Sequence, residues 1–213
     1  MFFHKEETIM RNRVNVRKIV MTAMLSAVSA VLMMLSFSVP FMPSYLKLDF
    51  SELPALIAAF SMGPVSGVAV CLIKNLINVL STTTGGVGEL SNFLLGCLFV
   101  IPAGLIYQNS KSRKSALIAS LVGTLVMTAG SLATNYYLVY PFYAKVMPIE
   151  VILNMYSAIL PGVNTLLAGL VVFNMPFTFL KGLLDVILTF LIYKRISPFI
   201  KGTWRATRAA VNE

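Results

Sequence analysis

Charged residues are scarce in this chain of 213 amino acids. They make up 12% of the sequence, whereas hydrophobic residues make up 57%. A soluble domain of ordinary composition has about 25% charged residues, so the charged side chains here are too few to cover a water-exposed surface. The composition argues against a soluble globular enzyme and against a disordered chain, and it predicts an all-α integral membrane protein.

Histidine and cysteine are also rare. His4 is the one histidine of the chain, and Cys71 and Cys97 lie within apolar runs, where we expect small core residues rather than a disulfide. The motifs GxSxG, HExxH and GxxxxGK[ST] do not occur, so nothing predicts a hydrolase, a zinc enzyme or an ATPase. We therefore expect no catalytic residues, no metal and no cofactor, and we expect that the chain itself does not hydrolyse ATP.

Acidic residues number only 8 against 17 lysines and arginines, which gives a net charge of +9. Basic clusters that flank apolar segments are typical of the cytoplasmic loops of membrane proteins. Thirteen of the 17 basic residues have this placement, namely Lys5, Arg11, Arg13, Arg17 and Lys18, then Lys111, Arg113 and Lys114, and finally Lys194, Arg195, Lys201, Arg205 and Arg208. The charge therefore indicates orientation in a lipid bilayer and does not indicate a nucleic-acid partner.

Hydrophobic runs predict six membrane helices. The predicted segments are residues 19–37, 53–62, 65–80, 90–107, 116–140 and 177–193. Residues 151–173 are a seventh candidate, which Pro161 and Gly162 interrupt. A seventh span would put the last basic cluster on the opposite side from the others, against the positive-inside tendency. We therefore predict six transmembrane helices with cytoplasmic N- and C-termini, and an outer segment 141–174 that holds short helices or a re-entrant piece.

The same pattern predicts one membrane domain over residues 1–213. A basic cytoplasmic arm covers residues 1–18, the six-helix bundle covers 19–195, and a basic cytoplasmic tail covers 196–213. The first apolar run lacks a cleavage site of small residues before a hydrophilic domain, so we interpret it as a retained span rather than a signal peptide.

Polar side chains recur at helical spacing within four of the apolar segments. Residues three, four or seven positions apart lie on one face of a helix, and polar groups inside a membrane need a partner, water or a ligand. The stripes are Asn174, Thr178, Lys181 and Asp185; Thr124, Thr128, Ser131 and Asn135; Glu89, Asn92 and Gly96; and Lys74 and Asn78.

Two interpretations apply to these stripes. Hydroxyls such as Thr124 are expected to hold helices together, Lys181 and Asp185 have the spacing of an ion pair, and Lys74 is equally suited to a structural ion pair or a ligand contact. Near the outer ends, Asn135, Thr178, Lys181 and Glu89 favour contact with a neutral polar ligand that has a flat ring. Aromatic residues between 136 and 143, Tyr136 and Phe142 among them, can stack on such a ring or form an interfacial belt.

The first apolar segment has a face of small residues. Ala23, Ala27 and Ala30 are spaced four and three positions apart, and Ser26 extends this face. Small residues at this spacing allow another helix to approach closely. The face therefore predicts docking of a partner protein in the membrane.

Several motifs together resemble one family. They are LKLDFSELPAL at 46–56, GPVSG at 63–67, LIKNL at 72–76, GVGELSNF at 86–93, TNYY at 134–137, PFY at 141–143 and PFTFLKG at 176–182. The sequence resembles, over about residues 15–195, the S components of energy-coupling factor (ECF) transporters, and among them the riboflavin-specific members.

This resemblance implies a six-helix protein of the bacterial plasma membrane that captures a vitamin from outside. Such proteins join a module of a transmembrane coupling protein and two cytoplasmic ATPases, and the face of Ala23 and Ala27 is expected to contact the coupling protein. The loop after the first helix is expected to cover the site. Thr178 stands where family members often have Asn, which keeps a hydroxyl but loses an amide.

The stripes and the resemblance together define the candidate site for riboflavin: Leu46, Lys47, Leu48, Glu89, Asn92, Asn135, Tyr136, Phe142, Asn174, Thr178 and Lys181. Two other functions are compatible with the same residues. One is an S component for another vitamin, such as thiamin or a folate. The other is a membrane assembly protein whose polar stripes only bind helices together.

Overall fold

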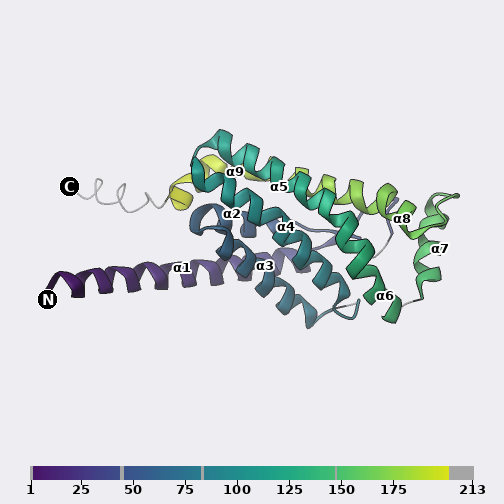
Figure 1. Cartoon of the computed structure of the whole chain (residues 1–213), viewed down its shortest axis with the longest axis horizontal. Coiled ribbons are helices and arrows are strands. Elements are labelled where there is room, and N and C mark those ends of the chain that lie inside the picture. Colours follow the sequence, from purple (N-terminus) through teal and green to yellow (C-terminus); the bar gives the residue numbers. More distant parts are fainter. Residues whose placement is uncertain (1, 44–45, 83, 147, 202–213) are drawn as a thin grey trace.

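The computed structural model describes residues 2–43, 46–82, 84–146 and 148–201, and these residues are almost entirely helical (Figure 1). The helices are α1 (Phe2–Met34), α2 (Glu52–Met62), α3 (Pro64–Val79), α4 (Val87–Asn109), α5 (Arg113–Thr134), α6 (Tyr140–Val146), α7 (Ile149–Ile159), α8 (Leu166–Gly169) and α9 (Met175–Lys201). Two π-helical turns, η1 (Asn135–Val139) and η2 (Leu170–Asn174), connect α5 to α6 and α8 to α9. The strands β1 (Phe37–Ser38) and β2 (Lys47–Leu48) form a small antiparallel ribbon, with Phe37 opposite Leu48. The all-α prediction is confirmed apart from this ribbon.

Four helical stretches in the described part of the chain are long and apolar enough to cross a membrane. They are Val16–Met34, Val87–Asn109, Arg113–Lys145 and Leu166–Ile192. The other two predicted spans correspond to α2 and α3, which have 11 and 16 residues and rise about 16 and 24 Å. The hydrocarbon core of a bilayer is about 30 Å thick, so neither helix crosses it by length alone, and the six-span count stays a prediction.

The outer segment is shorter than the predicted range 141–174. The helix of the fifth predicted span does not end at residue 140 but continues through η1 and α6. The helix of the last predicted span begins at residue 166 rather than 177. Both helices continue past a proline, Pro141 or Pro176, at which a helix would normally end. Each proline follows the last residue of a π-helical turn by two positions. A wider π turn accommodates the missing N–H and the ring of proline without ending the helix. The predicted break at Pro161–Gly162 is present, with Gly162 at a φ of 107°.

The described segments that carry basic clusters lie at one end of the molecule, and Arg205 and Arg208 fall outside the described residues. The start of α1, the turn between α4 and α5, and the end of α9 share this end, whereas α6, α7 and α8 lie at the other (Figure 1). A cation–π contact joins α5 to α9 here, with Arg113 Cζ 4.0 Å from the ring centroid of Phe190. The helices therefore bring together basic residues that lie far apart in the sequence.

The centre of the bundle is α2, which packs against α1, α3, α4 and α9. Residues Ala55, Leu56, Ala58 and Ala59 are fully buried, as expected for a short helix that is apolar on all sides. Gly63 ends α2 with a φ of 99°, and Pro64 begins α3 directly after it, a conformation that glycine adopts without steric cost. At the other end of α2, its first residue Glu52 lies at the pocket described below.

Candidate functional site

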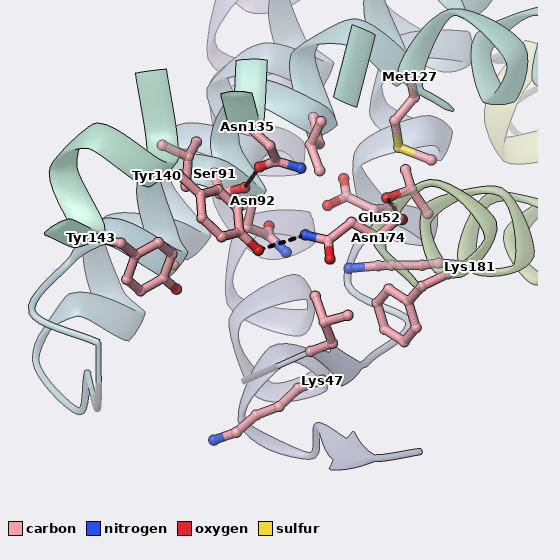
Figure 2. Close-up of a pocket in the computed structure, with 16 residues that line it drawn as sticks. Lys47, Glu52, Ser91, Asn92, Met127, Asn135, Tyr140, Tyr143, Asn174 and Lys181 are labelled. Carbon is pink, nitrogen blue, oxygen red and sulfur yellow. Dashed lines mark hydrogen bonds between the residues drawn. The ribbon is translucent and has the colours of Figure 1, made fainter. Parts of the chain in front are cut away.

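A pocket of about 700 Å³, counted to its open mouth, lies among the loop before α2 and the pocket-facing sides of α4, α5, η1, α6, η2 and α9 (Figure 2). The residues that line it are Leu46, Lys47, Glu52, Gly88, Ser91, Asn92, Leu95, Met127, Asn135, Val139, Tyr140, Tyr143, Asn174, Phe177, Thr178 and Lys181. The lining combines amides, hydroxyls, aromatic rings and one buried lysine.

The two π-helical turns position two asparagines of the pocket. Asn135 is the first residue of η1 and Asn174 is the last residue of η2, and both are buried. A π turn rotates the side chains that follow it relative to an α-helix, and such turns are frequent at functional sites. The pocket therefore lies where two long helices depart from regular geometry.

A triangle of hydrogen bonds fixes Asn174. Its Nδ2 donates to the hydroxyl of Tyr140 at 3.0 Å, and its Oδ1 accepts a bond of 2.8 Å from the hydroxyl of Tyr156. The two hydroxyls are themselves 2.6 Å apart. Because Tyr156 lies on α7, this outer helix holds a pocket residue in place without lining the pocket.

Asn135 and Asn92 are held from the side of α4 and α3. Ser91 donates a hydrogen bond of 3.2 Å to Asn135 Oδ1, which leaves the amide nitrogen of Asn135 turned toward the pocket (Figure 2). Asn92 Oδ1 accepts a bond of 3.3 Å from Asn75. Both amides are thus oriented before any ligand arrives.

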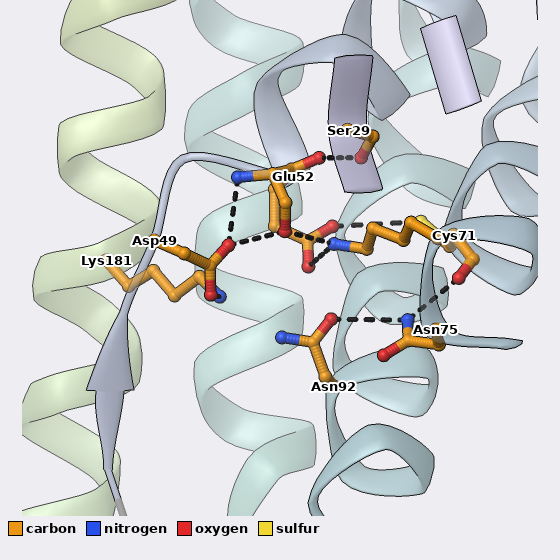
Figure 3. A network of polar contacts seen from close by, with 9 residues as sticks. Ser29, Asp49, Glu52, Cys71, Asn75, Asn92 and Lys181 are labelled. Atoms are coloured by element: carbon orange, nitrogen blue, oxygen red, sulfur yellow. Dashed lines mark hydrogen bonds and ion pairs between the residues drawn. The ribbon is translucent and has the colours of Figure 1, made fainter. Parts of the chain in front are cut away.

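An ion pair connects the loop before α2 to the pocket wall. Lys181 Nζ on α9 is 2.9 Å from Asp49 Oδ2, and Asp49 also accepts hydrogen bonds from the backbone and the hydroxyl of Ser51 (Figure 3). Burial alone would raise the pKa of the Asp49 carboxyl, but the ammonium groups of Lys181 and Lys74 outweigh burial and lower this pKa to about 2. Lys181 therefore has an acidic partner in a loop, and its sequence neighbour Asp185 is not that partner.

A second ion pair lies behind the first. Lys74 Nζ is 2.6 Å from Glu52 Oε1 and 2.6 Å from Ser51 Oγ, and Lys74 and Glu52 are almost completely buried. Cys71 Sγ lies 3.7 Å from the other Glu52 oxygen. Of the two interpretations open for Lys74, the structure supports the structural ion pair.

Seven of the eleven predicted site residues line the pocket: Leu46, Lys47, Asn92, Asn135, Asn174, Thr178 and Lys181. The hydroxyl of Thr178 donates to the carbonyl of Asn174 at 2.8 Å, so its oxygen keeps acceptor capacity toward the pocket. The ammonium of Lys181 reaches the same space (Figure 2). These residues come from four separate parts of the chain, namely the loop before α2, α4, η1 and the stretch from η2 into α9.

The other four predicted residues lie outside this lining, and their contact with a ligand stays a prediction. Glu89 accepts hydrogen bonds from Asn78, Thr82 and Thr84 and so orders the loop before α4. Leu48 is buried in β2. Tyr136 and Phe142 are 40% and 45% exposed on the outside of the bundle. Tyr140 and Tyr143 of the same aromatic run do line the pocket.

The sequence-based prediction missed several lining residues, among them Glu52, Ser91, Met127, Tyr140, Tyr143 and Phe177. Tyr140 and Tyr143 belong to the aromatic run. The π-helical turn η1 decides which rings of this run face the pocket, and hydrophobic periodicity does not predict such a turn. Ser91 precedes Asn92 directly, so it would not be expected on the same helix face.

The small-residue face of α1 is only partly exposed. Ala23 and Ala27 are exposed, whereas Ala30 and Ser26 are buried, at 4% and 1% exposure. The Ser26 hydroxyl donates to the carbonyl of Thr22 at 2.8 Å. The docking prediction is therefore restricted to Ala23 and Ala27, because Ala30 packs inside the bundle.

Comparison with known proteins identifies the family. The family model "ECF transporter, substrate-specific component" matches residues 17–193. The chain is 36% identical to "Riboflavin transporter RibU" of Staphylococcus aureus, over 87% of this chain and 93% of that protein. It is 35% identical to "Riboflavin transporter FmnP" of Bacillus subtilis, over 87% of this chain and 95% of that protein. A solved structure of the S component of a bacterial ECF transporter superposes with a TM-score of 0.69 at 35% identity, over 88% of this chain and 99% of that one.

The match covers the helices that build the pocket and the loop that carries Asp49. The family match agrees with the structure, in which several apolar helices are each long enough to cross a membrane. The chain belongs to the substrate-specific components of ECF transporters, which are multi-pass proteins of the bacterial cell membrane that bind a substrate and are not themselves enzymes.

Proposed function

We propose that this S component captures riboflavin from the outer side of the membrane in the pocket around Asn135, Asn174 and Lys181. The observation that carries the proposal is the lining itself, in which two oriented amides lie beside aromatic rings and hydroxyls. The names of two relatives at 35–36% identity support the same substrate.

The chemistry of riboflavin matches this lining group by group. Its flat neutral ring system suits stacking on Tyr140, Tyr143 or Phe177. The imide edge offers donors and acceptors to the amides, and the hydroxylated chain suits Thr178 and Lys181. Because riboflavin carries no net charge, it does not disturb the paired charges of Lys181 and Asp49.

In the membrane we propose six spans, with α2 and α3 counted among them, and both termini in the cytoplasm. The shared end of the basic clusters supports this orientation (Figure 1), since basic residues favour the cytoplasmic side. The chain is then one membrane domain, with the bundle at 19–195 between the basic arm 1–18 and the basic tail 196–213. The pocket opens at the opposite, outer end and needs no cofactor.

For energy we propose a module of a transmembrane coupling protein and two cytoplasmic ATPases. The exposed residues Ala23 and Ala27 on α1 support docking of the coupling protein, because small side chains permit close helix packing. ATP hydrolysis belongs to the partner subunits in this account.

The substrate is tested with purified protein and a panel of riboflavin, thiamin and folate. Riboflavin is expected to raise the unfolding temperature, since a ligand that binds only the native state stabilises it, and its fluorescence is expected to be quenched on binding. An absorption spectrum of protein extracted from riboflavin-grown cells is expected to show bound flavin. Stabilisation by thiamin or folate alone would overturn the choice of vitamin, and stabilisation by none of them would overturn riboflavin as the substrate.

A further inference from the structure

Asp185 on α9 is an ionisable group whose surroundings need an explanation. Its side chain is 0% exposed, and neither carboxylate oxygen has a hydrogen-bond partner among the described residues. An ionised carboxylate without a partner in a low-dielectric interior is strongly unfavourable, and such a group neutralises instead. Asp185 also lies outside the pocket lining, so the proposed substrate does not account for it.

The charged groups around Asp185 are already paired with one another. Those that act on it electrostatically are Lys181, Glu52, Asp49 and Lys74. Lys181 pairs with Asp49, and Lys74 pairs with Glu52. These two cations and two anions balance, so within this group of five residues an ionised Asp185 would leave one net negative charge, whereas a protonated Asp185 leaves none.

The helix that faces Asp185 offers hydroxyls rather than charges. On α5, Thr124 packs closely against Gly182 of α9. A Cβ atom added to Gly182 would lie 2.6 Å from the methyl group of Thr124. The Thr124 hydroxyl donates to the carbonyl of Ser120 at 3.0 Å. On α9 itself, the hydroxyl of Thr189 is buried four positions from Asp185 and has no hydrogen-bond partner in the described part of the chain. None of these groups neutralises a carboxylate.

Lys181 has two acids within reach. One is Asp49, and the other is Asp185, which lies four positions further along the same helix, a spacing at which side chains meet. The loop that carries Asp49 also contributes Leu46 and Lys47 to the pocket wall. A movement of this loop away from the pocket would therefore remove the first partner of Lys181 and leave Asp185 as the second.

We propose that Asp185 is a proton-binding site that is coupled to this loop. Asp185 holds a proton while Lys181 is paired with Asp49. When the loop leaves, Lys181 turns to Asp185, the O–H bond of the acid breaks, and the proton passes to water in the opened pocket. The position of the 46–51 loop is thereby linked to the gain or loss of one proton, whichever ligand the pocket holds.

Infrared spectroscopy of the purified full chain in lipid nanodiscs at neutral pH tests this site without any vitamin. The C=O stretching band of a protonated carboxylic acid is expected in the wild type and is expected to be lost in Asp185→Asn. Glu150→Gln, which changes an exposed acid on α7, is the matched control and should keep the band. In Asp49→Asn the band should also be lost, because Lys181 then pairs with Asp185 and ionises it.

A wild type without the band, or a band that persists in Asp185→Asn, would overturn the proton site. A band that persists in Asp49→Asn would overturn the exchange of partners. Thermal unfolding is a second measurement. Each single variant leaves Lys181 one acidic partner, so Asp49→Asn combined with Asp185→Asn should lower the unfolding temperature by more than the sum of the single changes. Additive shifts would contradict the exchange, and riboflavin binding is not needed for either result.

Discussion

Lys181 Nζ lies 2.9 Å from Asp49 Oδ2, although these two residues are 132 positions apart in the sequence. Lys181 lines the pocket, and Asp49 belongs to the loop that enters α2. The pair therefore holds a loop against the wall of the site. The stability of the protein and the shape of the pocket therefore depend on the same contact.

Acid is expected to destabilise the protein through Asp49. The pKa of this carboxyl falls from 3.8 to about 2 in the folded state, a difference equivalent to about 2 kcal/mol of stability. Because the folded-state pKa is lowered, this contribution is present above about pH 4 and is lost as the pH falls toward 2. Thermal unfolding in detergent across this range measures it. Lys181→Met should remove most of this pH dependence, and parallel curves for the two proteins would contradict the assignment.

Loss of one partner from the pair of Lys74 and Glu52 is expected to destabilise the protein more than loss of both. Lys74→Met leaves the Glu52 carboxylate buried without its cation, and removal of one partner from a buried pair costs about 3–5 kcal/mol. Lys74→Met combined with Glu52→Gln leaves no unpaired charge. The double variant should therefore unfold at a higher temperature than the single variant, and a lower temperature would argue against an ion pair at this position.

Tyr156→Phe is expected to weaken riboflavin binding although Tyr156 does not line the pocket. The change removes the hydroxyl that donates to Asn174 Oδ1 at 2.8 Å, so the amide loses its fixed orientation. A lost hydrogen bond of about 1 kcal/mol corresponds to a severalfold change in affinity. Fluorescence titration measures the Kd, and Tyr137→Phe on the exposed side of η1 is the control. Equal affinities of Tyr156→Phe and the wild type would refute a positioning role.

Ala27→Trp is expected to block riboflavin uptake by cells while binding by the purified protein is kept. Ala27 is exposed on α1 and does not line the pocket, so a bulky side chain there obstructs a partner helix rather than the ligand. Ala30→Trp is the contrasting variant. Because Ala30 is buried, tryptophan there should lower the unfolding temperature through overpacking. Loss of binding in Ala27→Trp would show that this face is internal.

Hydrophobic runs were sufficient to predict most of the helices. The end of α2 at Met62 and the start of α3 at Pro64 lie within one residue of the predicted bounds, because Gly63 and Pro64 are strong local signals. The region around Pro141 and Pro176 was predicted less well. Proline normally ends a helix, and the π turns that let both helices continue depend on packing rather than on local propensity.

The polar stripes predicted part of the site for a physical reason. Asn174, Thr178 and Lys181 share a helix face, and a membrane interior leaves few roles for such groups. Glu89 belongs to a similar stripe, but its partners include Thr82 and Thr84 of the preceding loop. Asp49 has no periodic signal, since it is a loop residue, and its partner on α9 could not be found from spacing.

The most direct test of the account is a riboflavin titration of the purified protein, followed by quenching of riboflavin fluorescence. The wild type should bind one riboflavin per chain. Asn135→Ala should weaken binding by about tenfold or more, since each 1.4 kcal/mol corresponds to about a factor of ten. Phe142→Ala, a change on the outer surface of the bundle, should bind as the wild type does. A folded wild type that does not quench riboflavin, or an Asn135→Ala variant with unchanged affinity, would contradict the proposed site.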